Sequence, residues 1–100
     1  MALAPEAPVT ARFGLAFAQN LYTAMVRRGL SDRALAKLAG MSHNTIGRLV
    51  RGEVLPDLGT IARLEVAIES DLYPAGLRSD FPPSAAHVDP GTGQGNPPPP

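Results

Sequence analysis

Apolar residues along this chain recur at the three- and four-residue spacing of amphipathic helices. The first series predicts a long helix from about Thr10 or Ala11 to Arg28, with an apolar face of Phe13, Phe17, Leu21, Ala24 and Met25. Gly29 then stands where a left-handed residue ends a helix, since glycine lacks the Cβ that would clash. Leu30 is expected to turn inward ahead of the next helix.

Residues 31–51 predict two short amphipathic helices that meet at a glycine turn. Ser31 and Ser42 are the candidate N-caps, because a hydroxyl oxygen accepts a hydrogen bond from a free N–H of the opening turn. Gly40 is expected to be left-handed between the two helices. The apolar sides of the two helices are expected to be Leu35, Ala36, Leu38 and Ala39 in the first, and Ile46, Leu49 and Val50 in the second.

A fourth helix is predicted from the N-cap Asp57 to about Glu69, with the apolar series Leu58, Ile61, Leu64 and Ile68. Leu72, Tyr73 and Leu77 are expected to close the core as a last short turn or helix. Glu65 falls on the apolar side of the fourth helix and leaves two interpretations open. A buried carboxylate would need a partner, such as an arginine of the first helix. Alternatively, the helix is rotated slightly and Glu65 is exposed.

These elements predict an all-α fold, a compact bundle of four to five short helices that contains a helix-turn-helix. We expect residues 9–78 to form the domain and residues 1–8 to be a flexible lead-in. Residues 79–100 hold seven prolines and three glycines. That stretch has too little apolar surface to offset the entropy of ordering, so it is interpreted as a disordered tail. A passive tail is the favoured interpretation, and a polyproline ligand for a protein partner is the alternative.

The composition of the chain argues against several classes of function. There is no cysteine, which excludes disulfides and thiolate metal sites. The two histidines are too far apart to suggest a metal site, and no glycine-rich phosphate loop or carboxylate pair precedes a suitable element. We therefore expect no enzyme, no cofactor and no metal. No apolar run approaches the roughly 20 residues of a membrane span, and no signal peptide is recognised, so a cytoplasmic protein without a membrane partner is expected.

Charge is balanced over the whole chain but unevenly distributed along it. The formal net charge is zero. All nine basic residues lie between Arg12 and Arg78, where six acidic residues leave an excess of +3. A local basic patch supplies attraction to phosphate, and here it would be made by Arg33, Lys37, Arg48 and Arg51. Because the patch is modest, any nucleic-acid binding should be sensitive to salt.

The polar side of the helix predicted after Ser42 is unusual for a solvated surface. At about 100° per residue, one arc contains His43, Asn44, Gly47, Arg48 and Arg51. Asn and Arg side chains read base edges in the major groove, which is about 12 Å wide and admits a helix. The glycine would let another surface approach the backbone closely. The alternative interpretation is a solvated face with a tolerated glycine, and the face alone favours neither.

Residues 31–52 resemble the helix-turn-helix of the phage repressor/Cro-type (XRE-like) family. The matching positions are Leu35-Ala36, Gly40-Met41-Ser42, Ile46, Leu49 and Arg51-Gly52, followed by Pro56 and the fourth-helix series. The resemblance covers roughly residues 13–77 and implies a lambda-repressor-like DNA-binding domain. It further implies a sequence-specific transcriptional regulator, a repressor, that reads double-stranded DNA as a dimer with the helix Ser42–Arg51. A bacterial origin follows, either nucleoid-associated or phage-encoded.

The resemblance also assigns roles to individual residues. Base contacts are implied for His43, Asn44 and Arg48. Contacts with the DNA backbone are implied for Ser31, Arg33, Lys37, Thr45 and Arg51. The chain departs from the family at Asp32, where the family often has glutamine; a carboxylate there repels phosphate, and Arg33 is the replacement expected.

Two further interpretations concern partners. Val54 and Leu55 stand where the family commonly has basic or polar residues, and they are the candidate contacts of a homodimer. The alternative is that one of them folds back onto the core. The rival function is a protein-interaction module of the same fold, an antitoxin or partner-docking subunit with little or no DNA binding. Zero net charge, Asp32 and the proline-rich tail favour that rival.

Overall fold

The computed structural model describes residues 8–88, and its elements are helical throughout that range. Residues 1–7 and 89–100, which hold most of the predicted lead-in and of the predicted tail, lie outside the described residues. The α-helices are α1 (Val9–Arg28), α2 (Asp32–Ala39), α3 (His43–Val50) and α4 (Leu58–Ile68), followed by the 3-10 helices η1 (Leu77–Asp80) and η2 (Pro83–Val88). The predicted all-α bundle is therefore confirmed.

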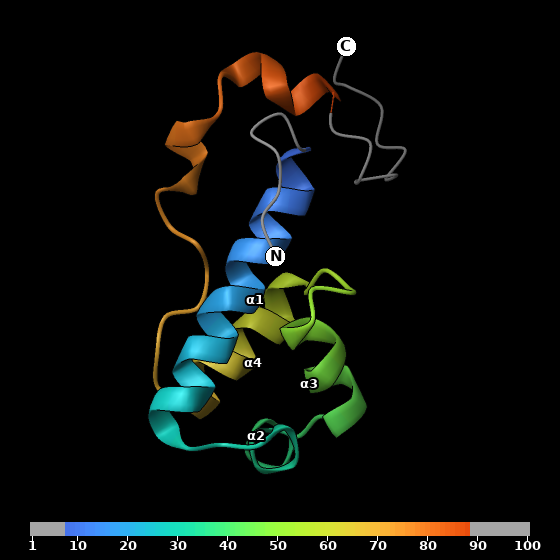
Figure 1. Ribbon diagram of the computed structural model, residues 1–100, viewed down its shortest axis with the longest axis vertical. Helices are drawn as coiled ribbons and strands as arrows, with labels where there is room; N and C mark the ends of the chain where they lie inside the picture. The colour runs from blue at the N-terminus through green and yellow to red at the C-terminus, as the bar shows by residue number, and fades with distance from the viewer. Residues whose placement is uncertain (1–7, 89–100) are drawn as a thin grey trace.

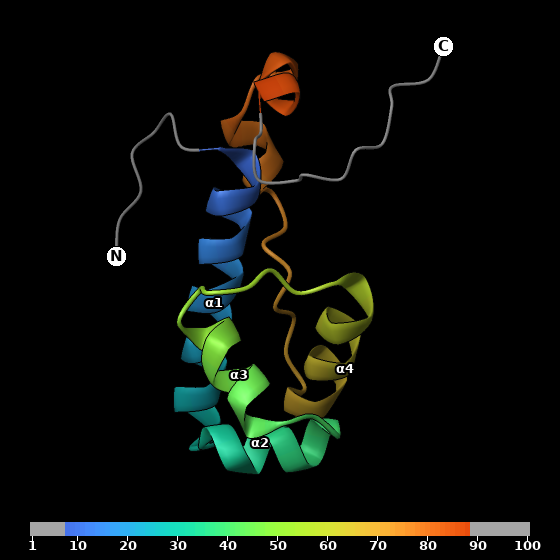
Figure 2. The ribbon, with the colours of Figure 1, turned by 90° about the vertical axis from the view of Figure 1, so that its right-hand side faces the viewer.

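The long helix α1 is the element beside which the others are arranged (Figure 1). Near the C-terminal end of α1 the chain turns into α2, and α3 and α4 pack beside the C-terminal half of α1. Seen after a 90° turn, α3 and α4 stand on either side of the bundle above α2 (Figure 2). The chain after α4 then returns along α1 towards its N-terminal end (Figure 1).

Local capping signals end and begin these helices as the sequence predicts. Gly29 and Gly40 are left-handed, with φ of 64° and 67°. The Ser31 hydroxyl accepts a hydrogen bond from the amide of Ala34, and the Ser42 hydroxyl accepts one from that of Asn44, each at 3.1 Å. Both caps satisfy amides that lack an intrahelical partner, so the positions of α2 and α3 are set from within the turn itself.

The core lies where the four α-helices meet. Its buried members are Phe17, Leu21, Ala24, Met25, Leu35, Ala36, Ile46, Leu49, Leu64, Ile68 and Leu72. Leu30 packs against this cluster as predicted, and so do Val50 and Ile61.

Three predicted core residues are wrong: Leu38, Leu58 and Tyr73 are 60%, 79% and 51% exposed. In α2 the buried stripe passes through Leu35 and Ala36, which leaves Leu38 outside. In α4 the buried positions are Leu64 and Ile68, and Leu58 in the first turn lies outside them. Tyr73 follows the buried Leu72, and its ring lies 6.1 Å from that of Phe13, between centroids.

Glu65 has a partner, but the partner is backbone rather than an arginine. Its Oε2 accepts hydrogen bonds from the amides of Leu72 (2.8 Å) and Tyr73 (3.1 Å). These two bonds, the one from Leu72 first, lower the pKa of the Glu65 carboxyl below its ordinary value, because they favour the charged form. Asn20 of α1 donates to the Leu72 carbonyl oxygen at 2.8 Å. The turn that follows α4 is thus held by hydrogen bonds with Glu65 of α4 and with Asn20 of α1.

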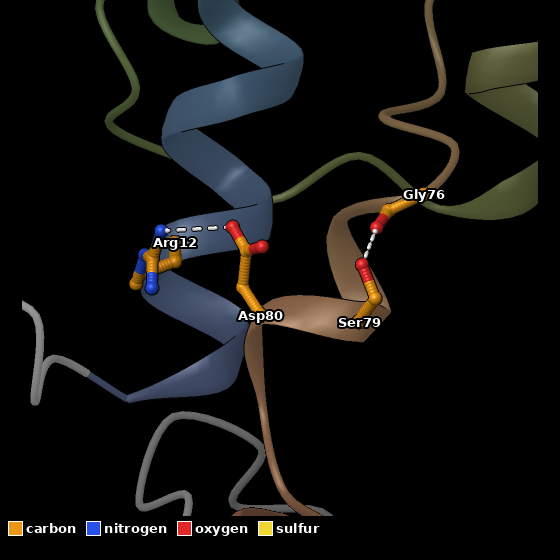
Figure 3. Close-up of polar contacts among 4 residues, drawn as sticks. All are labelled: Arg12, Gly76, Ser79 and Asp80. Carbon is orange, nitrogen blue, oxygen red and sulfur yellow. Dashed lines mark hydrogen bonds and ion pairs between the residues drawn. The ribbon is translucent and has the colours of Figure 1, made fainter.

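The described part of the predicted tail differs from the disorder expected after Ser79. The Phe81 ring stacks on Phe13 with centroids 6.2 Å apart, and Arg12 lies 4.8 Å above the Phe81 ring. Arg12 also pairs with Asp80 at 3.5 Å, and the Ser79 hydroxyl donates to the Gly76 carbonyl at 2.8 Å (Figure 3). An aromatic contact with α1 therefore orders a stretch whose composition alone predicts disorder. The domain boundary at residue 78 itself stays a prediction.

Candidate nucleic-acid interface

The inner side of α3 packs into the core, which leaves its outer face exposed. Ile46 and Leu49, on its inner side, are buried in the core, and the Ser42 cap fixes its first turn. The turn from α2 into α3 is tied to α4 as well, since Arg63 donates to the carbonyl oxygens of Ala39 (3.0 Å) and Gly40 (2.7 Å). These carbonyls lie at the C-terminal end of α2, where a cation satisfies groups that the helix leaves open.

The three residues expected to touch bases differ in their exposure to solvent. Asn44 and Arg48 are exposed, whereas His43 at the first position of α3 is partly buried. Thr45 and Arg51, expected at phosphates, are exposed too. The structure therefore brings the predicted residues of α3 together on and beside one helix, with His43 the least accessible of them.

The residues of α2 and its N-cap that are expected to contact the DNA backbone differ in whether they already have a partner within the chain. Arg33 and Lys37 are exposed, and within residues 8–88 neither forms an ion pair. The hydroxyl of Ser31 already accepts the Ala34 amide, so its remaining capacity is that of a donor. Near the turn, Arg33 and Lys37 are therefore cations without an acidic partner among the described residues.

The arginines at the end of α3 are compensated by a residue that the sequence analysis did not single out. Glu53 accepts a hydrogen bond from Nε of Arg51 at 2.6 Å, and its other carboxylate oxygen lies 4.0 Å from Nε of Arg48. The hydrogen bond from Arg51 lowers the pKa of Glu53, and the same bond raises the pKa of Arg51. The only sequence signal for this arrangement is a carboxylate two residues after Arg51, beyond a glycine.

Gly47 makes room for the chain itself and not only for an approaching surface. It is buried, and a Cβ added there would lie 3.1 Å from Nη1 of Arg51 and 3.2 Å from Oδ2 of Asp32. Asp32, which begins α2, therefore lies against α3 beside the Arg51 guanidinium. A side chain at position 47 would press on this intramolecular contact, and the close approach of another molecule at Gly47 stays a prediction.

The two candidate dimer residues have different surroundings. Val54 is partly buried and packs against the core, as the alternative interpretation had it. Leu55 is 53% exposed, with its Cδ2 over Gly14. Larger exposed fractions belong to Leu58 and Val66 of α4, both 79%.

Two short helices joined by a tight glycine turn, with the second presenting an exposed polar face, define a helix-turn-helix domain. The chain belongs to the helix-turn-helix family HTH_3, whose profile matches residues 21–73. The predicted resemblance to the XRE-like helix-turn-helix family is thereby confirmed. None of the helices between residues 8 and 88 is long and apolar enough to cross a membrane.

Two solved structures are similar to this chain. An HTH_3 family transcriptional regulator from Vibrio cholerae is 30% identical, with a TM-score of 0.61, over 64% of this chain and 36% of that one. This chain thus spans little more than a third of that regulator. The restriction-modification controller protein C.AhdI from Aeromonas hydrophila is 28% identical, with a TM-score of 0.56, over 68% of this chain and 96% of that one. Among curated proteins, no sequence matches this chain.

Proposed function

We propose that this protein is a sequence-specific, DNA-binding transcriptional regulator that acts as a repressor by laying α3 in the major groove of its site. The observation that carries the proposal is the exposed polar face of α3, held from behind by the buried Ile46 and Leu49. A helix fixed in this way presents side chains to base edges without reorganising the core. Membership of the same family as a transcriptional regulator supports it.

Within this proposal the residues of the interface divide into two groups. Asn44, Arg48 and the partly buried His43 read base edges, with Arg48 placed for the O6 and N7 of a guanine. Thr45, Arg33 and Lys37 contact phosphates, which fix the register of the protein without carrying sequence information. Ser31 and Arg51 belong to the second group, although each already has a partner within the chain.

Selection of bound duplexes from a random DNA pool at near-physiological salt tests the proposal directly. Enrichment of one motif is the expected result, and a palindromic motif indicates a dimer, because operator symmetry mirrors protein symmetry. A pool that stays random after successive rounds contradicts sequence-specific binding.

Replacing Arg48 and replacing Arg51 by alanine should change DNA binding in different ways. Arg48→Ala is expected to weaken binding to the selected site by about 1–3 kcal/mol and to relax preference at one base pair. Arg51→Ala is expected to weaken all sequences alike and to reduce the salt slope by at most about one unit per protomer. Isotherms on the site and on single-base variants, at several salt concentrations, measure both. An Arg48→Ala protein with unchanged base preference contradicts the assignment.

We also propose that the protein binds as a homodimer, and two surfaces are candidates. The first is the predicted pair Val54 and Leu55, of which Leu55 remains half exposed. The second is a shallow apolar groove between α2 and α4, whose lining includes Leu38, Ala62 and Val66. A symmetric dimer uses one such patch twice. Sedimentation of Val66→Glu and Leu55→Glu proteins distinguishes them: the variant that stays monomeric where the parent dimerises marks the interface, and two unchanged masses exclude both patches.

A protein-interaction module is the second candidate function. Glu53 and Asp32 lie beside the arginines of α3, and apolar side chains of α2 and α4 are exposed, which are the observations that favour it. In this case the selection enriches no motif, and the groove between α2 and α4 binds a partner protein such as a toxin. The α3 substitutions Asn44→Ala and Arg48→Ala would then leave partner binding unchanged, whereas Val66→Glu would abolish it.

A further inference from the structure

The carboxylate of Glu53 is held in place beside α3 by the backbone. The helix ends at Arg51, and Gly52 then takes a left-handed conformation with φ of 71°. The chain consequently turns back, so that the Glu53 amide donates to the Arg48 carbonyl oxygen at 2.9 Å. The backbone at Glu53 is thus anchored at the end of α3, within reach of both arginines.

From that position the carboxylate meets the two arginines unequally. Its hydrogen bond with Arg51 is 2.6 Å long, whereas its nearer approach to Nε of Arg48 is 4.0 Å. Asp32 lies near the Arg51 guanidinium, beside Gly47. Arg51 is therefore bound by Glu53 with a second carboxylate nearby, and Arg48 is only loosely held by Glu53.

We propose that Glu53 limits the affinity of the protein for DNA of any sequence, because its carboxylate competes with DNA for the arginines of α3. The inference rests on the proposed function. Binding to arbitrary DNA depends on the number of phosphates that the protein neutralises. The Glu53 carboxylate competes with phosphate for Arg51, and more weakly for Arg48. Each arginine therefore reaches DNA only by giving up its contact with Glu53.

Replacing Glu53 by glutamine tests this reasoning, because the amide oxygen still accepts a hydrogen bond but carries no charge. On a duplex with the selected site or on a scrambled one, the arginines then reach DNA without first leaving a carboxylate. Each added phosphate contact steepens the salt slope by about 0.9 and raises affinity roughly fivefold to tenfold near 100 mM salt. Glu53→Gln should therefore bind both duplexes more tightly, by up to roughly fivefold to tenfold for each arginine that is released.

Glu69→Gln is the matched control, since it makes the same change in charge at another ion-paired glutamate. Glu69 binds Arg28 at 2.9 Å, where α1 and α4 end. Titrations use labelled duplexes of equal length and base composition, one with the selected site and one scrambled. An unchanged affinity in Glu53→Gln, or an equal rise in Glu69→Gln, overturns the inference and leaves DNA binding intact. Absence of binding to either duplex by the parent and both variants overturns the proposed function and the inference together.

A measurement without DNA separates the two claims further. The Glu53 carboxyl carbon is titrated by NMR in the parent and in Arg51→Gln, with Arg48 and Asp32 as the other charged neighbours. The pKa of Glu53 should be lower in the parent, because Arg51 donates to its charged form. Equal pKa values in the two proteins show that the contact is absent in solution and overturn the inference, whatever the affinity for DNA.

Discussion

The helix-turn-helix unit, residues 21–73, and the C-terminal segment, residues 74–88, are stabilised by different means. Nearly all the buried side chains belong to the unit, and the few others, such as Phe17, lie just before it in α1. None of the side chains described between residues 74 and 86 is buried. That segment is held by the ring contact of Phe81 with Phe13 and by the exposed pair Arg12–Asp80.

The difference determines how strongly a substitution in each region should lower stability. Burying one leucine contributes about 1.5–3 kcal/mol, whereas an aromatic pair adds about 0.5–1.5 and a surface ion pair about 0–1. The unit should therefore unfold as a whole, while the segment opens locally at little cost. The face of α3 that we propose to read DNA belongs to the first region, so its geometry should not depend on the second.

The largest effect is expected from Leu64→Ala, which opens a cavity in the middle of the unit. Leu64 is fully buried, so the substitution should lower the free energy of unfolding by about 2–5 kcal/mol. Leu58→Ala is the control in the same helix, because that side chain is exposed; it should change stability by no more than about 0.5 kcal/mol. Urea unfolding measures both, and equal losses would contradict the assigned orientation of α4.

Glu65 tests the border between the two regions, where its carboxylate binds the amides of Leu72 and Tyr73. Glu65→Gln should cost roughly 1–2 kcal/mol at pH 7, since the charged acceptor is lost. The pKa of Glu65 is lowered in the folded protein, so its contribution is present above the ordinary carboxyl pKa of about 4.3 and disappears as pH falls through the folded value. Unfolding curves of parent and variant should therefore converge on acidification, and a pH-independent difference would contradict this role.

Phe81→Ala should detach the C-terminal segment and leave the unit folded. The loss in global stability is expected to be about 1 kcal/mol or less, because the ring is only partly buried. Hydrogen exchange should speed up at the amides of Ser79 and Phe81, which bond within η1, and remain slow in α3 and α4. Tyr22→Ala, at an exposed ring on α1, is the control and should change exchange at neither place. Loss of protection in α3 would show that the two regions are coupled.

The smallest effect is expected at Glu69, where backbone conformation and an ion pair oppose each other. Glu69 ends α4 with φ of 56°, a left-handed conformation that costs a non-glycine residue about 1 kcal/mol. Glu69→Gly relieves this strain but loses the exposed pair with Arg28, so stability should rise by a few tenths of a kcal/mol to about 1 kcal/mol. Glu69→Ala loses the pair and keeps the strain. Thermal unfolding should therefore rank glycine above alanine, and the opposite order would contradict the reasoning.

The sequence by itself determined the helices and their ends. Spacing of apolar residues predicted α1 to α4, and the caps Ser31, Ser42 and Asp57 each bond an amide two or three residues ahead. Gly29 and Gly40 are left-handed where the sequence placed helix ends. Such signals are readable because cause and effect lie within one turn of the chain. The same locality placed the polar face of α3 on one side of its helix.

Tertiary structure alone decided which of several equivalent neighbours each side chain meets. Periodicity predicts that a helix has an apolar face, but it does not show that Leu58, a member of that series, lies outside the core. The partners of Glu65 are amides seven and eight residues later, and Arg63 caps a helix that ends more than twenty residues earlier. The approach of Asp32 to the Arg51 guanidinium likewise depends on how α2 packs on α3. These contacts are set by the packing of whole helices, which the order of residues along one helix does not encode.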